Sequence, residues 1–283
     1  MVSEVIVVNE GDFEKKKKAI IADGPSKFHV VSDFDRTITY GLDNNGERTP
    51  TVISQLRSDP KYLGDDYQKK ANELFDIYHP IEIDPNISLE EKQKKMYEWW
   101  TKHFNFITQS GLSKSLISKV IKEKPLKFRE GSHEFFSTLD KFNVPLVFMS
   151  ASTGDLLEEY LKQNDLMTED VYVVANRYKF NEKGIALEVQ EPIIHTFNKT
   201  EVALKDHPIF QKIKDRTNVL LMGDSLGDVG MIKGFDYKNL IKIGFLNENI
   251  DTSLESYKKN FDVVITHDGS IDYVNKLIGE ILK

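Results

Sequence analysis

The stretch Phe28-His29-Val30-Val31-Ser32-Asp33-Phe34-Asp35-Arg36-Thr37 decides the fold. It joins a short apolar run, Phe28 to Ser32, to two carboxylates, Asp33 and Asp35. An unbroken apolar run of this length is typical of a strand that is buried on both faces of a parallel sheet. Asp33 and Asp35 then stand at the carboxyl end of that strand, which is the edge where open α/β sheets bind their ligands.

Further apolar runs rich in β-branched residues predict more strands of the same kind: Val144 to Ser150, Val171 to Ala175, Val219 to Gly223, Leu240 to Phe245 and Val263 to Thr266. Helical patterns precede or separate these runs: Phe13 to Ala22, Ser132 to Phe142, Asp155 to Gln163, Pro208 to Lys214 and Ser270 to Leu282. This alternation predicts an α/β fold with a doubly wound, Rossmann-like parallel sheet.

One long segment interrupts the alternation. About 110 residues separate the first two predicted strands, far too many for a single crossover. Within them we expect helices over Asp65 to Tyr78, Ser88 to Gln109 and Ser113 to Glu123, the second of which opens with Ser88 and Glu91 in a capping-box pattern. We therefore predict an α/β core formed by residues 1–41 and 128–283, and a helical cap, residues 42–127, inserted after the first strand and placed over the ligand edge of the sheet.

Composition narrows the class of protein. The 283 residues include 38 Lys and Arg against 45 Asp and Glu, a net charge of −7, which argues against binding to polymeric nucleic acid. The chain has no cysteine, which excludes disulfides and Cys-based metal sites. No apolar run approaches the ~18 residues of a membrane span, and Met1 to Asp12 lacks the basic start of a secretory signal. We therefore expect a cytoplasmic, monomeric protein with no membrane partner.

Other polar clusters join Asp33 and Asp35 at the same predicted edge. Ser150 and Ala151 follow the second strand, Asp224 and Asp228 follow the Val219 to Gly223 strand, and Lys199 lies between these two clusters in the sequence. Four acidic groups gathered at one edge repel one another unless a cation lies between them. A hard divalent ion with oxygen ligands meets this need, and Mg²⁺ suits a site that also holds a phosphate.

In this order the clusters resemble the four motifs of haloacid dehalogenase-type phosphohydrolases: DxDxT, a Ser or Thr after the second strand, a Lys, and GDxxxD. More closely, the chain resembles the cytosolic pyrimidine 5′-nucleotidase (type III) family. The resemblance covers nearly the whole chain: SDFDRTIT (32–39), IEIDP (81–85), EEK and EWWTK (90–92 and 98–102), FMSASTGDLLEEYL (148–161), IIHTFNK (193–199), NVLLMGDSLGD (218–228) and LIKIGFLN (240–247).

The resemblance implies a Mg²⁺-dependent 5′-nucleotidase that hydrolyses nucleoside 5′-monophosphates. Asp33 would attack phosphorus and form an aspartyl-phosphate, and Asp35 would act as general acid and then as general base. The implied metal ligands are Asp33, the backbone carbonyl of Asp35 and Asp224, with Asp228 either a further ligand or a hydrogen-bond acceptor beside the ligands. The implied phosphoryl-binding groups are Ser150, the Ala151 amide and Lys199.

For the cap, the resemblance implies that Glu82 contacts the base and that Trp100 and His103 contribute to substrate binding. Trp100 stands where pyrimidine-preferring relatives carry Tyr, and His103 where they carry Ser. Because an indole stacks well on a large or cationic base, N7-methyl-GMP joins CMP and UMP as a candidate substrate. The alternative is that Trp99 and Trp100 only pack the core of the cap.

Other functions stay open at this stage. The chain could be another capped phosphatase acting on a small phosphomonoester such as phosphoserine, a phosphotransferase, or an inactive binding module. Three residues depart from the family pattern: Arg36 replaces an apolar residue, Ser152 a glycine and Thr153 an Ile or Leu. The departures leave every expected reacting group in place.

Overall fold

The computed structural model describes residues 3–84, 86–199, 208–233 and 236–283; Pro85 of the IEIDP motif lies outside them. In that part of the chain, seven strands form one sheet in the order β1-β9-β8-β7-β2-β3-β4. Every pairing is parallel except that of β1 with β9. The strands of this sheet are β1 (Val5–Val7), β2 (Phe28–Ser32), β3 (Leu146–Thr153), β4 (Val171–Asn176), β7 (Asn218–Gly223), β8 (Asn239–Leu246) and β9 (Val263–Thr266).

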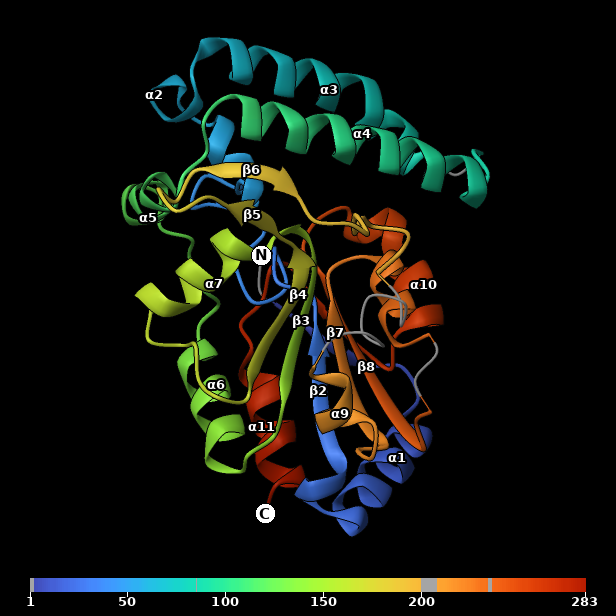
Figure 1. Ribbon diagram of the computed structural model, residues 1–283. Helices are drawn as coiled ribbons and strands as arrows, with labels where there is room; N and C mark the ends of the chain where they lie inside the picture. Colours follow the sequence, from blue (N-terminus) through green and yellow to red (C-terminus); the bar gives the residue numbers. More distant parts are fainter. Residues whose placement is uncertain (1–2, 85, 200–207, 234–235) are drawn as a thin grey trace.

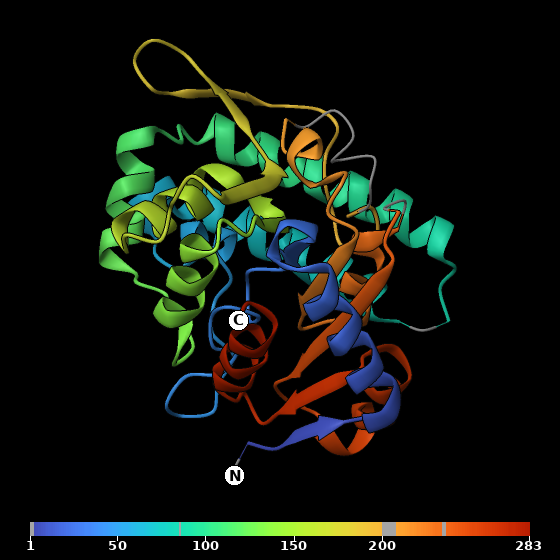
Figure 2. The same cartoon turned by 90° about the horizontal axis from the view of Figure 1, so that it is seen from below.

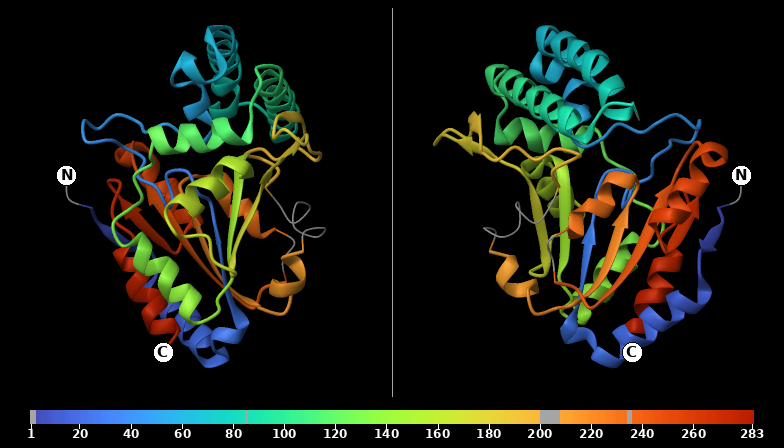
Figure 3. Two further views of the ribbon diagram at one scale, coloured as in Figure 1. Left: turned by 60° about the vertical axis from the view of Figure 1, so that its left-hand side comes forward. Right: turned by 90° about the vertical axis from the view of Figure 1, so that its right-hand side faces the viewer.

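Helices cover both faces of the sheet (Figure 3). Neighbouring residues of one strand pack in opposite layers: Leu220 belongs to the larger apolar cluster and Leu221 to a second one. On the first face lie α1 (Glu10–Asp23), α6 (Ser132–Lys141), α7 (Gly154–Gln163) and α11 (Asp272–Ile281). On the second face lie α9 (Phe210–Ile213), η3 (Leu226–Ile232) and α10 (Ile250–Asn260). The prediction of a doubly wound α/β sheet is confirmed.

The cap helices follow β2 and lie across the carboxyl ends of the strands (Figure 1). They are η2 (Ile53–Arg57), α2 (Pro60–Leu63), α3 (Asp65–Ile83), α4 (Leu89–Gln109) and α5 (Lys114–Glu123). The Ser88 hydroxyl caps α4 by accepting from the Glu91 amide at 3.2 Å. The predicted end of α3 at Tyr78 was five residues short, because the helix continues past Pro80 to Ile83. Glu82 therefore lies in the last turn of α3.

Two features were absent from our prediction. The short apolar segment Val5–Val7 forms the edge strand β1, which lies antiparallel beside β9 at the rim of the sheet (Figure 2). After β4 the chain forms a hairpin, β5 (Tyr178–Phe180) with β6 (Ala186–Val189), which rises to the cap. The Lys114 amide donates to the Gly184 carbonyl at 2.9 Å, and the Ala186 amide donates to the Leu112 carbonyl at 2.8 Å. The hairpin therefore bonds to cap residues, and the division into core 1–41 and 128–283 and cap 42–127 stays a prediction.

Candidate active site

Asp33 lies at the carboxyl end of the central strand β2, where its amide donates to the Met222 carbonyl of β7 at 3.0 Å. The sheet register thus fixes its backbone. The residue is 5% exposed, and its Oδ1 accepts from Lys199 Nζ at 2.5 Å. Lys199 comes from the loop after the β5–β6 hairpin and is 7% exposed, so the carboxylate and the ammonium form a buried ion pair.

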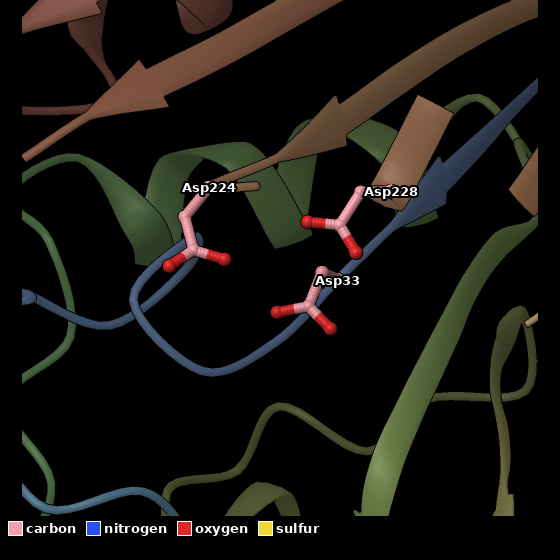
Figure 4. Close-up of side chains that lie close together, drawn as sticks. All are labelled: Asp33, Asp224 and Asp228. Atoms are coloured by element: carbon pink, nitrogen blue, oxygen red, sulfur yellow. The ribbon is translucent and has the colours of Figure 1, made fainter. Parts of the chain in front are cut away.

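Asp224 and Asp228 reach the same point from β7 and η3 (Figure 4). One oxygen from each of Asp33, Asp224 and Asp228 lies within 4.8 Å of the other two. Asp228 Oδ1 accepts from Lys199 at 3.3 Å, while its Oδ2 accepts from the Ser225 amide at 3.0 Å and closes a capping box. A Cβ at Gly223 would lie 2.4 Å from the Cβ of Asp228, so only glycine fits there.

This cluster carries excess negative charge. Three carboxylates face one ammonium, and no described residue donates a hydrogen bond to the Asp224 carboxylate. Burial, and then the nearby charge of Asp228, raises the pKa of Asp224 to about 7. Burial likewise raises the pKa of Asp33, against the opposing charge of Lys199. Burial alone would lower the pKa of Lys199, but Asp33 and Asp228 raise it, so this side chain is a cation. An oxygen-only donor set with two uncompensated charges fits a hard divalent cation.

Asp35 stands two residues beyond Asp33 in a different environment. Its Oδ1 accepts from the Val52 amide at 2.8 Å, which ties the loop after β2 to the start of the cap. Burial raises the pKa of Asp35 to about 6, with the Val52 amide acting in the opposite direction. A carboxyl that titrates near neutral pH is suited to both donating and accepting a proton.

On the other side of Asp33, β3 ends in an irregular segment. The pairing of β3 with β4 shifts register between Met149 and Thr153, so residues 150–152 lie outside the regular ladder. Ser150 is buried, and its Oγ accepts from the Ser152 amide at 3.1 Å. Such a bulge leaves backbone groups for other partners, as is common beside active sites.

These groups line a cavity of about 740 Å³ that extends from the sheet edge into the cap. Its sheet end holds Asp33, Asp35, Ser150, Ala151, Lys199, Asp224 and Asp228. Its cap end holds Phe75, His79 and Glu82, which lie four and then three residues apart on α3. Glu82 Oε1 accepts from the Thr196 hydroxyl at 2.6 Å, so a core loop and the cap meet across the cavity.

Comparison with known proteins identifies the family. Residues 36–282 match the family described as pyrimidine 5′-nucleotidase (UMPH-1). The chain belongs to this family. It is therefore an enzyme of the phosphoric monoester hydrolase class, as the sequence analysis predicted.

Its relatives are similar over nearly their full length. The 7-methylguanosine phosphate-specific 5′-nucleotidase of Gallus gallus is 38% identical over 267 residues, covering 94% of this chain and 91% of that protein. The protein of the same name from Homo sapiens is 36% identical and covers 100% and 94%. A crystal structure of cytosolic 5′-nucleotidase IIIB bound to cytidine superposes with a TM-score of 0.90 at 29% identity, covering 98% and 93%.

A more distant likeness concerns the fold alone. A substrate-bound phosphoserine phosphatase superposes with a TM-score of 0.53 at 17% identity, over 87% of this chain and 96% of that one. The haloacid dehalogenase-type fold is thereby confirmed. None of the helices in the described part of this family member is both long and apolar enough to span a bilayer.

In this 5′-nucleotidase family member, Trp100 and His103 lie side by side on α4 and line the cavity. Their rings are 5.9 Å apart. His103 is 5% exposed, and its Nε2 shares a hydrogen bond of 3.0 Å with the Tyr67 hydroxyl. Burial, and then the charge of Arg57, lowers the pKa of His103 to about 3, so this imidazole is neutral. Trp99 packs against Leu74, Tyr78 and Met96 and also borders the cavity.

The three departures from the family pattern have distinct surroundings. Thr153 caps α7, with its hydroxyl accepting from the Leu156 amide at 3.4 Å. Arg36 has a φ of 61°, and its Nη2 donates to the Thr49 carbonyl at 3.2 Å. Its side chain therefore forms part of the cavity wall. Ser152 is 4% exposed, and its hydroxyl has no hydrogen-bond partner among the described residues.

Several cavity residues were not predicted from the sequence. Thr196 lies three residues before Lys199, and that spacing was its one available signal. Arg48, Arg57, Gln68 and Asn72 lie in stretches without a motif, and only the folded cap brings them to the cavity.

Proposed function

We propose that this protein hydrolyses nucleoside 5′-monophosphates to nucleosides and phosphate through an aspartyl-phosphate on Asp33. The observation that supports this most is the placement of Asp33. Its carboxylate lies between Lys199 and the pair Asp224 and Asp228, at the floor of a cavity whose other end is aromatic. A phosphate group bound at the sheet end of the cavity would leave room for the base at the cap end.

In the proposed reaction, an Asp33 oxygen attacks phosphorus while Asp35 gives its proton to the departing ribose 5′-oxygen. The P–O bond to the ribose breaks as the bond to Asp33 forms. Asp35 then takes a proton from water, whose oxygen attacks phosphorus and frees both phosphate and Asp33. Lys199, Ser150 and the Ala151 amide hold the phosphoryl oxygens as negative charge spreads over them.

Magnesium is the proposed cofactor, held by Asp33, Asp224, Asp228 and the backbone carbonyl of Asp35. When bound, it would reduce the repulsion between the attacking carboxylate and the phosphate. The fit rests on the oxygen-only donor set and its uncompensated charge.

The proposed substrates are CMP, UMP and N7-methyl-GMP, with Glu82, Trp100 and His103 as base-binding residues. We choose these bases because the family and the relatives are named for pyrimidine and 7-methylguanosine nucleotides. The residues line the cap end of the cavity, where Trp100 offers a ring for stacking and His103 is neutral. A solved relative is named a cytosolic 5′-nucleotidase, which supports the cytoplasm as the proposed location.

The test measures phosphate release from these nucleotides, ribose 5-phosphate and phosphoserine, with Mg²⁺ and with a chelator. We expect Mg²⁺-dependent hydrolysis that favours nucleotides over phosphoserine by at least about tenfold. Asp33→Asn should abolish turnover while leaving the circular dichroism spectrum unchanged. A preference for phosphoserine would reject the nucleotidase assignment, and full activity of Asp33→Asn would reject the nucleophile.

A further inference from the structure

Arg57 ends η2 and brings a positive charge to the cap end of the cavity. Its guanidinium carbon lies 4.7 Å from the centre of the Phe75 ring, and its Nη1 donates to the Ala71 carbonyl at 3.3 Å. Both partners belong to α3, so the side chain lies along the face of the helix that borders the cavity.

Arg57 has no ion-pair partner among the described residues. Burial lowers the pKa of its guanidinium. Glu82, which the cap contributes to the cavity, is hydrogen-bonded to Thr196 instead. Asp76 is exposed and acts on Arg57 only at longer range. With Nη1 on a backbone carbonyl, the rest of the guanidinium fork lacks an acceptor among the described residues.

The effect of this charge reaches the base-binding rings. Arg57, Trp100 and His103 line the same cavity. The charge of Arg57 also acts on His103 and on Tyr67, which share a hydrogen bond. A base that enters the cap end beside Trp100 therefore meets a cation.

We propose that Arg57 selects the base, favouring nucleotides whose base has a keto oxygen at the pyrimidine C4 or purine C6 position. This inference rests on the proposed function and names its substrate class. A guanidinium carries five N–H donors and no acceptor, so it can bind O4 of uracil or O6 of guanine. At the same ring positions cytosine and adenine carry an amino group, which is itself a donor and cannot accept a hydrogen bond from Arg57.

The same charge acts against a cationic base. N7-methylguanine carries a positive charge on its five-membered ring, and two like charges in a partly buried cavity repel each other. Among guanine nucleotides, Arg57 therefore favours GMP over N7-methyl-GMP. Among its proposed substrates, this member of the family would then favour UMP over CMP and N7-methyl-GMP, unlike relatives that are named for the methylated nucleotide.

The test compares kcat/KM for UMP, CMP, GMP, AMP and N7-methyl-GMP, with ribose 5-phosphate as a substrate that lacks a base. Wild type should favour UMP over CMP and GMP over AMP by roughly 10- to 100-fold. Arg57→Met keeps an unbranched apolar stem but removes the charge and the donors. It should reduce both ratios to about one, raise the rate for N7-methyl-GMP, and leave ribose 5-phosphate within twofold.

Arg48→Met is the matched control. Arg48 lines the same cavity but already pairs with Glu248, so its loss should leave the UMP-to-CMP ratio unchanged. Should Arg57→Met fold poorly, Arg57→Lys keeps the cation without the fork and should retain only part of the preference.

A wild-type preference for CMP or N7-methyl-GMP over UMP, or an unchanged UMP-to-CMP ratio in folded Arg57→Met or Arg57→Lys, would overturn the role of Arg57. Either result leaves the nucleotidase assignment intact. Cleavage of ribose 5-phosphate without cleavage of any nucleotide would instead reject the proposed function, and the selection of a base with it.

Discussion

Lys199 is the residue on which the charge balance of the site depends. Its ammonium touches two buried carboxylates, at 2.5 Å from Asp33 and 3.3 Å from Asp228. Removing one partner of a buried ion pair leaves the other charge uncompensated. In the proposed reaction Lys199 also binds the phosphoryl group, so its loss affects both folding and catalysis.

We predict that Lys199→Met lowers kcat/KM for UMP by about 10²- to 10³-fold, the usual effect of losing one group that stabilises developing charge. Urea unfolding should also show lower stability. Lys199→Arg, which keeps the charge, should unfold closer to wild type. Wild-type kinetics in Lys199→Met would show that this lysine does not contact the substrate.

Trp100 is predicted to act on the base alone. Replacing it with Ala removes stacking worth about 1–3 kcal/mol per base, so KM for nucleotides should rise by roughly 5- to 150-fold. Trp100→Phe should recover most of the loss, and ribose 5-phosphate should be cleaved by both variants as by wild type. An equal loss on ribose 5-phosphate would mean that Trp100 only packs the cap.

Sequence and structure agree best for residues at strand ends. Asp33 and Asp224 could be predicted to meet because both follow strands that are neighbours in one parallel sheet. The roles of these residues stay predictions, but their proximity follows from topology. Arg57 could not be predicted, because its place in the cavity depends on how η2 packs against α3.

At the scale of elements, the two segments that join cap and core are held together. The Tyr40 amide donates to the Lys127 carbonyl at 2.9 Å. Fully buried Arg129 pairs with Asp268 at 3.0 Å and donates to the carbonyls of Arg36 and Thr37. Asp268 in turn accepts from the amides of residues 41 and 42, both at 2.8 Å. The Arg129–Asp268 ion pair therefore joins both segments to the loop that follows Asp35.

We predict that Arg129→Met lowers the free energy of unfolding by about 3–5 kcal/mol, because the buried Asp268 loses its cation while three backbone carbonyls lose their donor. Asp268→Asn should cost less, since its amide oxygen can still accept a hydrogen bond. Urea titration measures both. An unfolding midpoint equal to that of wild type in Arg129→Met would contradict a structural role for this pair.

The predicted bounds were most accurate for strands in which every residue is buried. β2 and β9 have the predicted bounds, and the other predicted strands differ by one to three residues at an end. The hairpin β5–β6 was missed because its strands have only three and four residues and carry charged side chains, which gives no continuous apolar run. Helix α3 was predicted to stop before Pro80, yet a proline in the last turn removes only one hydrogen bond there.

At the scale of the whole molecule, stability responds to acid through histidines buried in separate regions. His29 lies in the sheet, His103 in the cap and His195 in the loop that leads to Lys199. Burial lowers the pKa of each, to about 4, about 3 and about 4. Their folded pKa values lie below the unfolded value near 6.5, so their contribution to stability is complete above pH 6.5 and is lost as pH falls.

The buried carboxyls Asp35 and Asp224 act in the opposite direction, because their raised pKa values let the folded state bind protons first. A pH profile of wild type alone would therefore mix both effects. Comparing a histidine variant with wild type separates them, since the carboxyl contribution is common to both.

We predict that His103→Gln is less stable than wild type at pH 7.5 and that this difference narrows by roughly 1.4 kcal/mol per pH unit below pH 6.5. Glutamine keeps a polar partner for the Tyr67 hydroxyl but takes up no proton. His133 is exposed, so His133→Gln is the matched control for replacing a histidine outside the core. Urea unfolding at pH 7.5, 6.5 and 5.5 measures these differences. If that for His103→Gln stays constant, then His103 titrates alike in the folded and unfolded chains, and burial does not keep it neutral.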